Sequence, residues 1–502
     1  MSEKQGIEPI VLSNSTLSRL PHALARPSYD RRRIVPGIVH IGVGGFNRSH
    51  LAVYLDDLLE RGEANPWGEF GIGLLPADKS LHDALALQDC LYGLMLMDSG
   101  GESYRVIGSL SNHVYAPDSR EVVLARLSSP ECRIISLTVT EGGYFIDGGL
   151  GTLPLDHSDL RHDLSHPETP RTWLGYVAEA ANRRMRQGSG PFTLLSCDNL
   201  QHNGATARAA LLAFAGERSP ALCNWIESNV ATPNSMVDRI TPRSTDEHRA
   251  TIAERFGIFD RAPVVAEPFR QWVLEDSFAA GRPAWELTGV QFTTDVAPYE
   301  RTKMRLLNGG HSAIGYAADL LGISTISEAV SDPLVRELLI AFMSEVRPTL
   351  RSLPGIDLDD YIATILRRFS NTAIRDQVPR ICSDGCAKIA KFLVPSLEDL
   401  LVAGADPQII PLVIALWLHY LRGYDENGRA VTISDPLLKA IKPSLITGGN
   451  TAEQVFAVRS IFGGMRSRFP SLAGTIQTSL DGLRACGVRA TIAKTLERIQ
   501  AP

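Results

Sequence analysis

The sequence predicts an α/β protein with two parts: a doubly wound parallel sheet domain and a mostly α-helical C-terminal domain. In the first part, short apolar runs alternate with helical patterns, as they do in a parallel sheet with crossover helices. From about residue 295 onward nearly every segment has helical spacing, interrupted by proline and glycine. We therefore expect a sheet domain over residues 1–295 and a helical domain over residues 296–502.

The predicted strands are short apolar runs that end in turn-type residues. The first, GIVHIGV at residues 37–43, suits a strand buried on both faces. A helix with apolar residues at helical spacing is predicted over residues 50–59. Further strands are predicted at 70–78, 104–108, 132–140 and 192–199, and further helices at 120–129, 172–188 and 204–217.

Composition and charge exclude several classes of protein. The net charge of −6 argues against a protein that binds nucleic acid or anionic membranes through a basic face. The longest apolar run, residues 409–421, is too short to span a bilayer and contains His419, so it predicts a buried helix. The N-terminus lacks a basic start followed by an apolar segment, so it does not predict a secretory signal.

The seven cysteines are scattered and odd in number, which does not indicate a disulfide framework. Cys382 and Cys386 are close in sequence, but without a second Cys/His pair at zinc spacing they do not predict a metal site. These features predict a cytoplasmic protein without a metal. The two-domain size permits a monomer, which we expect rather than an oligomer.

A glycine-rich turn, IGVGGFNRSH at residues 41–50, joins the first strand to the first helix. Glycines without a Cβ and helix N–H groups that face an anion are what a phosphate-binding turn needs. Asn47 stands where the third glycine of the dinucleotide fingerprint would be, and methyltransferases also have such turns. We expect a Rossmann-type cofactor site formed by Gly42, Gly44, Gly45, Phe46 and Arg48. The alternative for Arg48 is a solvated residue at the start of a helix.

Asp78, at the end of the second predicted strand, is the candidate for binding the cofactor ribose. It lies 36 positions after Gly42, farther than the usual spacing of about 20, and the polar insert RGEANPWGE accounts for the excess. An acidic residue here favours NAD. Nearby Lys79 and His82 leave NADP open.

The segment KMRLLNGGHSAIGY, residues 303–316, places polar residues in a run that otherwise reads as a buried helix. At about 100° per residue, Lys303, His311 and Asn308 would lie at about 0°, 80° and 140° around a helix, so all three could face one cavity. The alternative is an amphipathic helix whose polar face is exposed to solvent.

Two further segments carry candidate polar residues. Asn199 and Asn203 follow the predicted strand that ends near Cys197, and the carboxyl edge of a parallel sheet is where ligands bind. Asp238 lies in the turn-rich segment NSMVDRITP. The alternatives are asparagines that bond to their own turns and an aspartate that pairs with Arg239 or another base.

Together these segments identify a resemblance to the polyol-specific long-chain dehydrogenase/reductase family. It covers almost the whole chain and is most specific in the lysine–asparagine–histidine segment. The matching stretches are HIGVGGFNRSH, LTVTEGGYFID, SCDNLQHNG, NSMVDRITP, PFRQWVLEDSF, KMRLLNGGHSAIGY, RFSNTAIRDQVPRICSDG and YLRGYDENG.

The resemblance implies roles for individual residues. Lys303 matches the general base, and Asn199 and Asn308 match a pair that polarises the carbonyl. His311 and Arg380 match substrate-binding residues, and Asp238 one on the proton path of the lysine. Two departures are Asn47, where a histidine is frequent, and Ala77, where an acidic residue precedes the aspartate; the second weakens strict selectivity for NAD.

The implied reaction is the reversible, NAD(P)-dependent oxidation of a polyol to a ketose at a secondary hydroxyl, with mannitol and fructose as the preferred pair. A lysine removes a proton only when neutral, and burial beside Met304 and Leu307 favours the neutral amine. Two amides can stabilise the alkoxide, so no metal is required. Alternatives are dehydrogenases of sorbitol, arabinitol or altritol, a reductase of fructuronate or tagaturonate, a nucleotide-binding regulator without catalysis, and a methyltransferase.

Overall fold

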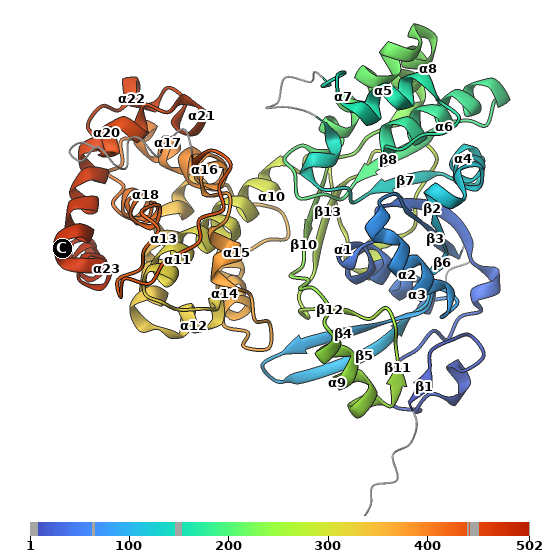
Figure 1. Ribbon diagram of the computed structural model, residues 1–502, viewed down its shortest axis with the longest axis horizontal. Coiled ribbons are helices and arrows are strands. Elements are labelled where there is room, and N and C mark those ends of the chain that lie inside the picture. Colours follow the sequence, from blue (N-terminus) through green and yellow to red (C-terminus); the bar gives the residue numbers. More distant parts are fainter. Residues whose placement is uncertain (1–8, 63–65, 146–152, 439–440, 442–450, 501–502) are drawn as a thin grey trace, which may run out of the picture. The chain divides into compact units, whose positions relative to one another are not determined.

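The computed structural model describes residues 9–62, 66–145, 153–438, 441 and 451–500. The chain divides into two compact units, Met1–Ala297 and Pro298–Pro502, which we call the sheet domain and the helical domain. Every strand of the described residues lies in the sheet domain, and the helical domain consists of helices and their connections (Figure 1). The predicted fold class, an α/β domain followed by a mostly helical one, is confirmed.

The main sheet of the first domain has six parallel strands in the order β6-β3-β2-β7-β8-β9. The chain runs from the central strand β2 outward to β3 and β6, then returns to the other side of β2 for β7, β8 and β9. This is the doubly wound order, and its direction reverses between β2 and β7. The strands are β2 (Val35–Ile41), β3 (Trp67–Gly73), β6 (Leu110–Tyr115), β7 (Ile134–Leu137), β8 (Phe192–Ser196) and β9 (Val230–Ala231).

Both faces of this sheet are covered, which is why most residues of its central strands are apolar. Helices α4 (Arg120–Ser128), α6 (Trp173–Gln187) and α7 (Asn203–Arg218) pack on one face, against side chains such as Val39 and Ile135. Helix α2 (Leu51–Glu60) packs on the other face. The helices predicted at 120–129, 172–188 and 204–217 are confirmed.

One predicted strand pairs differently from the expectation, and one predicted helix, confirmed as α2, has a short helix before it. The run at 104–108 lies in β5 (Gly101–Ile107), which pairs antiparallel with β4 (Tyr92–Asp98) in a separate sheet. The helix predicted over 50–59 is preceded by a short helix, α1 (Gly45–Ser49), and the two are separated at His50. The His50 ring bonds to the Gln271 carbonyl at 2.9 Å and packs on aromatic neighbours, which holds the backbone away from helical geometry.

Three smaller sheets complete the first domain, in the orders β12-β4-β5, β10-β13-β14 and β1-β11. The other elements are β1 (Ile10–Val11), α3 (Lys79–Ala86), α5 (Ser158–Ser165), α8 (Pro220–Asn229), β10 (Ser235–Asp238), α9 (Asp246–Phe256), β11 (Ile258–Phe259), β12 (Val264–Ala266), β13 (Gln271–Glu275), β14 (Gln291–Thr293) and the 3₁₀ turns Leu17–Arg19, Arg31–Arg33, Pro76–Asp78, Ala116–Asp118, Glu141–Tyr144 and Trp285–Thr288.

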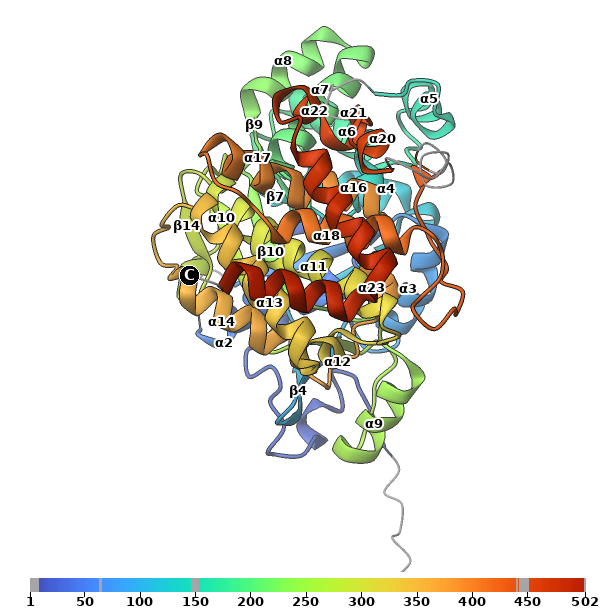
Figure 2. The same cartoon turned by 90° about the vertical axis from the view of Figure 1, so that its left-hand side faces the viewer.

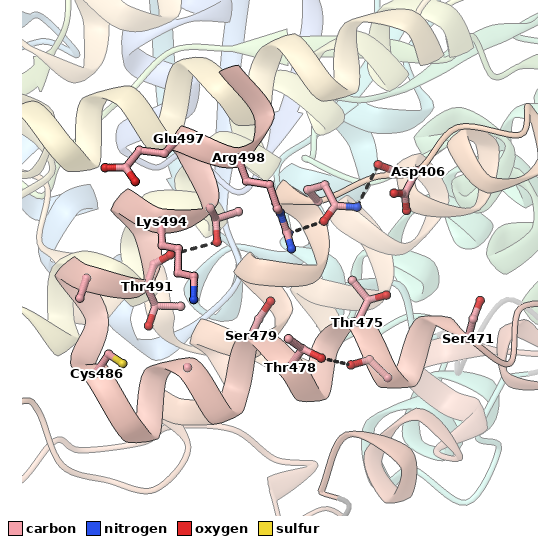
Figure 3. A pocket seen from close by; sticks show the side chains of 15 residues that line it. Asp406, Ser471, Thr475, Thr478, Ser479, Cys486, Thr491, Lys494, Glu497 and Arg498 are labelled. Carbon is pink, nitrogen blue, oxygen red and sulfur yellow. Dashed lines mark hydrogen bonds between the residues drawn. The ribbon is translucent and has the colours of Figure 1, made fainter. Parts of the chain in front are cut away.

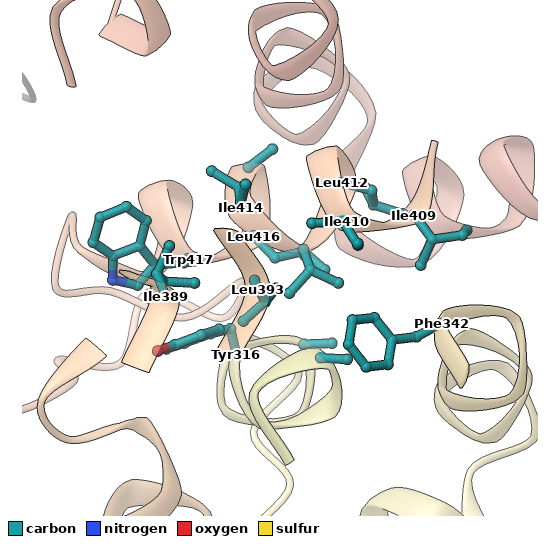
Figure 4. Close-up of a cluster of buried hydrophobic side chains, with 14 of the residues drawn as sticks. Tyr316, Phe342, Ile389, Leu393, Ile409, Ile410, Leu412, Ile414, Leu416 and Trp417 are labelled. Atoms are coloured by element: carbon teal, nitrogen blue, oxygen red, sulfur yellow. The ribbon is translucent and has the colours of Figure 1, made fainter. Parts of the chain in front are cut away.

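The helical domain is built around two buried helices, α11 (Gly309–Leu320) and α18 (Ile409–Tyr420). Figure 4 shows Tyr316 of α11 and Phe342 of α13 (Pro333–Val346) on the same side of α18, whose residues are all buried. The buried helix predicted at 409–421 is thus confirmed. No helix in the described part of the chain is long and apolar enough to cross a membrane.

The last helix, α23 (Leu472–Gln500), packs along α18 and bends at Gly487 (Figure 2). The other elements of this domain are α10 (Ala297–Thr302), which begins at the domain boundary, the π-helices η7 (Lys303–Asn308) and η9 (Ile389–Leu393), α12 (Ile326–Ser331), the 3₁₀ turn Arg347–Thr349, α14 (Leu358–Phe369), α15 (Val378–Cys382), α16 (Gly385–Lys388), α17 (Val394–Val402), α20 (Thr451–Phe456), α21 (Arg459–Phe462) and α22 (Met465–Arg468).

Candidate functional site

The glycine turn lies at the carboxyl end of β2, beside β7. Gly42 has φ +95°, and a Cβ there would stand 2.2 Å from the Thr138 carbonyl oxygen, so the position requires glycine. Gly44 is the N-cap of α1, and among the described residues a Cβ on it would have only the Gly42 carbonyl oxygen as a neighbour, at 3.8 Å. The N-terminus of α1 therefore begins at an open point where the sheet reverses direction. These features fit the pyrophosphate of a dinucleotide.

The side chains of α1 hold the turn in place. Phe46 stacks on His50 with ring centroids 4.8 Å apart. Arg48 is 7% exposed, and its guanidinium donates to the carbonyl oxygens of Gly44 at 3.2 Å and Ala262 at 2.5 Å. Arg48 is thus not the solvated residue of the alternative interpretation. Its contact with a pyrophosphate stays a prediction.

Asp78 follows β3, the strand next to β2, and is half-buried in a 3₁₀ turn. Its Oδ2 accepts a hydrogen bond from the Leu75 N–H at 2.8 Å, so the carboxylate caps its own turn. Part of the insert that precedes it in sequence belongs to β3, which begins at Trp67. The position suits a ribose contact, since the neighbouring strand end is where such carboxylates lie in doubly wound sheets.

The polar residues after β8 separate into two kinds. Asn203 is fully buried, and its Nδ2 donates to the carbonyl oxygens of Asp198 at 3.0 Å and Ser235 at 2.9 Å. Because Asn203 joins α7 to β10, its amide serves the fold. Asn199 is exposed on the loop, and Asp238 is the last residue of β10 with 4% exposure. The sheet domain therefore places Asn199, and not Asn203, where solvent reaches it.

Lys303 and Asn308 begin and end a π-helix, η7, that leads directly into α11. The Gly309 N–H reaches the Met304 carbonyl, five residues earlier. A regular α-helix would separate residues 303 and 308 by about 140°, whereas an i→i+5 turn places the later residue over the earlier one. Lys303 is 7% exposed. The solvent-exposed amphipathic helix is therefore excluded, and the π-turn brings the two side chains toward one face.

Two atoms near this π-turn are buried and unsatisfied. Oδ1 of Asn308 and Nε2 of His311 have no hydrogen-bond partner among the described residues. Buried polar atoms are nearly always bonded, and exceptions concentrate at sites that receive a ligand. The helical domain therefore presents an amide oxygen and an imidazole nitrogen three residues apart on one helical segment.

The surroundings of His311 keep its ring neutral. Burial is the main reason that the pKa of His311 is lowered to about 4, and Arg380, Arg368 and Lys388 add to the effect while Asp376 opposes it. A neutral imidazole can donate or accept one hydrogen bond at Nε2, according to its tautomer. This suits a substrate hydroxyl, which can do both.

Arg380 lies on α15 and is exposed. Its guanidinium is paired with Asp376, the Nη2 atom lying 2.6 Å from Oδ1 and 2.7 Å from Oδ2. Sequence reasoning missed Asp376, which lies four residues before Arg380. It also missed Lys388, whose Nζ donates to the Ile381 carbonyl at 2.8 Å. The i,i+4 spacing of Asp376 and Arg380 could have indicated the first; nothing local indicates the second.

Gly309 and Gly310 lie where the helix packs closely against another helix of its own domain. A Cβ on Gly309 would stand 2.9 Å from Cζ of Phe342, and one on Gly310 would stand 3.1 Å from Cδ1 of Leu339. Both neighbours belong to α13. Tight helix packing therefore accounts for the glycine pair.

A cavity of about 960 Å³ in the helical domain lies away from all these residues. Figure 3 shows it between the two arms of the bent helix α23, with Ser479 and Thr478 on one arm and Lys494 and Arg498 on the other. The described residues that line it include none of those predicted from the sequence. The described residues also contain no group of three or more histidine, cysteine, aspartate or glutamate side chains arranged to hold a metal ion.

Comparison with known proteins places both domains. The Rossmann domain of mannitol dehydrogenase matches residues 36–287, and the C-terminal domain of mannitol dehydrogenase matches residues 295–484. A mannitol 2-dehydrogenase of Phaeosphaeria nodorum is 42% identical over 494 residues, which cover 97% of this chain and 86% of the relative.

Two solved structures are similar to this chain over nearly its whole length. The Pseudomonas fluorescens mannitol 2-dehydrogenase in ternary complex with NAD and D-mannitol is 42% identical with a TM-score of 0.86, covering 97% of this chain and 100% of that one. A D-sorbitol dehydrogenase in substrate-free form is 38% identical with a TM-score of 0.90, covering 96% and 100%. Similarity of this extent in sequence and in fold shows that the chain belongs to the mannitol dehydrogenase family.

Proposed function

We propose that this protein is an NAD-dependent polyol dehydrogenase that interconverts D-mannitol and D-fructose by oxidising or forming a secondary hydroxyl. The π-turn carries the proposal, because it joins a buried lysine to an amide and an imidazole whose buried atoms lack partners in the described part of the chain. The names of the relatives supply mannitol as the polyol, whose oxidation at C2 gives fructose, and the glycine turn supplies a place for the dinucleotide.

In the proposed reaction the cofactor transfers the hydride and residues of the protein transfer the proton. A bound nicotinamide supplies the acceptor or donor of hydride. Lys303 takes the proton from the substrate hydroxyl during oxidation, and as the ammonium returns it during reduction of the ketose. Lys303 is 7% exposed, and removal from water disfavours the charged form of an amine, which cannot act as a base.

The amides and the imidazole act on oxygen atoms of the substrate. The N–H groups of Asn308 and Asn199 stabilise the alkoxide without adding a competing charge. We propose that His311 and Arg380 bind further hydroxyls of the open-chain substrate, and that Asp238 serves the proton path of the lysine. Gly42, Gly44, Gly45, Phe46, Arg48 and Asp78 form the proposed cofactor site.

We also propose that the protein works as a monomer in the cytoplasm. All seven cysteines are free, five of them buried, which supports a reducing compartment. Size-exclusion chromatography with light scattering measures the oligomeric state directly.

A second substrate is favoured by one observation. The D-sorbitol dehydrogenase matches this fold with a TM-score of 0.90, slightly above that of the mannitol enzyme. Sorbitol and mannitol differ in the configuration of one carbon, so a site that binds either polyol uses the same types of hydrogen bond.

The test is a panel of polyols with NAD and NADP and of ketoses and hexuronates with NADH and NADPH. We expect the highest kcat/KM with mannitol and NAD and with fructose and NADH. A higher kcat/KM with sorbitol would favour the second candidate. Absence of turnover with every polyol and ketose would contradict the proposal. Thermal stabilisation by S-adenosylmethionine and not by dinucleotides would indicate a methyltransferase, because ligand binding stabilises the folded state.

A further inference from the structure

A buried glutamate on the central sheet contacts the helix of the glycine turn. Glu69 is 1% exposed on β3, where it pairs with Ile38 of β2 and Leu110 of β6. Asn47 of α1 is fully buried, and its Nδ2 donates to Oε2 of Glu69 at 3.2 Å. This hydrogen bond ties the turn that would receive the dinucleotide to the strand beside it.

Each partner of this bond has a second oxygen that is unsatisfied. Oε1 of Glu69 and Oδ1 of Asn47 are buried, and neither has a hydrogen-bond partner among the described residues. An ionised carboxylate only accepts hydrogen bonds, so it cannot satisfy the amide oxygen. A single proton on Oε1 can be donated to Oδ1 while Nδ2 donates to Oε2. The acid and the amide would then each donate one hydrogen bond to the other and accept one from it.

The cation next to Asn47 in the sequence is bound to other groups. Arg48, the next residue of α1, directs its guanidinium to the carbonyl oxygens of Gly44 and Ala262. His40 of β2 and His113 of β6 lie on the flanking strands, and burial lowers the pKa of each to about 3, so both are neutral. Burial raises the pKa of Glu69 to about 8, and the bond from Asn47 opposes this only in part.

Tyr92 and Cys197, whose pKa values Glu69 affects, and the buried Asp56 change charge outside the range from neutral to moderately alkaline pH. Burial raises the pKa of Tyr92 on β4 and of Cys197 after β8 well above their ordinary values, and Glu69 contributes to both shifts. Asp56 of α2 has a pKa raised to about 6 by burial and bonds to Tyr29 and Gly108. Glu69 is therefore the group expected to titrate above pH 7 at this position.

We infer that Glu69 keeps a proton in the folded protein and, through reciprocal hydrogen bonds with Asn47, positions the glycine turn for dinucleotide binding. The inference rests on the proposed function for its ligand. When the proton leaves, a carboxylate oxygen faces the amide oxygen with no donor between them, and the pair keeps only the hydrogen bond from Nδ2 to Oε2. Glu69 is a positioning residue, because it acts through Asn47.

The test compares three proteins: wild type, Glu69→Gln and the control Glu121→Gln, whose side chain is 73% exposed in the same domain. NADH is titrated by its fluorescence from about pH 7 to about pH 9.5. We expect the Kd of the wild type and of Glu121→Gln to rise above about pH 8, by at most about tenfold per pH unit. The Kd of Glu69→Gln should stay level, because an amide at this position donates to Oδ1 of Asn47 at every pH. The inference would be overturned if the Kd of Glu69→Gln rose with pH as steeply as that of the wild type. It would also be overturned if the Kd of the wild type did not change with pH.

A second measurement needs neither a variant nor a ligand. Infrared spectra of wild-type protein with ¹³C-labelled glutamate carboxyls separate glutamic acid from aspartic acid bands. We expect a protonated glutamic acid band at neutral pH that disappears with a midpoint near pH 8. If no such band titrates above neutral pH, the inference fails. If the band titrates but NADH binds to none of the proteins, the proposed function fails and the acid–amide pair stands.

Discussion

The ring of His311 stacks on the ring of Phe369, with centroids 4.0 Å apart and planes inclined by 20°. The contact joins the segment after the π-turn to the end of α14. It fixes the plane of the imidazole and therefore the direction in which Nε2 points. Since that nitrogen is buried and lacks a partner in the described part of the chain, its fixed position suits the proposed hydrogen bond with a substrate hydroxyl.

Replacing His311 with alanine should raise the KM for the polyol. A lost neutral hydrogen bond is worth about 0.5–1.5 kcal/mol, which corresponds to a KM about 2- to 10-fold higher. NADH affinity should not change. The control is His22→Ala, which removes an exposed histidine of the sheet domain. An unchanged polyol KM in His311→Ala would exclude the imidazole from substrate binding.

The sequence indicates the glycine turn and the lysine–asparagine–histidine segment because each depends on neighbours in the chain. A strand, glycines and a helix in succession are enough to predict the position of Gly42. The His311–Phe369 stack joins residues 58 positions apart, and the Asn47–Glu69 bond depends on where α1 packs on β3. Neither could be predicted from local sequence.

Other differences between the predicted and the observed structure also have physical reasons. Strand β6 was not predicted, because Ser111, Asn112 and His113 interrupt its apolar pattern. The π-turn at Lys303 contains ordinary helix-forming residues, so its sequence predicts a regular helix. The close approach of Gly309 and Gly310 to α13 is set by tertiary packing, which no helical period reveals.

Changing Asp78 to asparagine should weaken discrimination between the two dinucleotides. A carboxylate pairs with the ribose hydroxyls and repels a 2′-phosphate, so Asp78→Asn should lose more affinity for NADH than for NADPH. Asparagine still accepts a hydrogen bond from the Leu75 N–H, which keeps the turn intact. Asp78→Ala removes the cap as well and serves as the comparison. Equal losses for NADH and NADPH in Asp78→Asn would remove Asp78 from the cofactor site.

Replacing Gly309 with alanine should destabilise the helical domain. The added methyl group would stand 2.9 Å from Phe342, and overpacking of this kind costs about 1–3 kcal/mol. Gly474 of α23 has open space around its Cα, so Gly474→Ala should instead stabilise the protein by about 0.4–1 kcal/mol. Urea unfolding of both variants measures the difference. Equal changes in the free energy of unfolding for the two variants would contradict this. They would show that α13 shifts to accommodate the methyl group without loss of stability.

The folded state should lose stability in mild acid. Burial lowers the pKa of His40, His50 and His113 to about 3 and that of His311 and His419 to about 4. Between the ordinary histidine pKa of about 6.5 and these values, the unfolded chain binds protons that the folded chain does not. Stability therefore falls as pH drops through this window, by up to about 1.4 kcal/mol per pH unit for each histidine.

His419 offers a variant for this prediction. Its Nε2 accepts a hydrogen bond from Arg422 at 2.9 Å, so protonation removes the acceptor. Glutamine at this position keeps an acceptor oxygen and does not titrate. The melting temperature of His419→Gln should decline less steeply than that of the wild type between about pH 6.5 and about pH 4.5. Identical declines would show that His419 is not among the histidines that make the fold sensitive to acid.

The most direct test of the proposed reaction is the Lys303→Ala variant, assayed for mannitol oxidation with NAD and, separately, for NADH binding. The variant removes the proposed base and leaves the glycine turn untouched. Turnover should fall by about 10²–10⁴-fold, the usual contribution of a positioned acid–base group, while the NADH dissociation constant changes little. Turnover equal to that of the wild type, with a loss of stability below about 0.5 kcal/mol, would contradict the central claim and make Lys303 a structural residue.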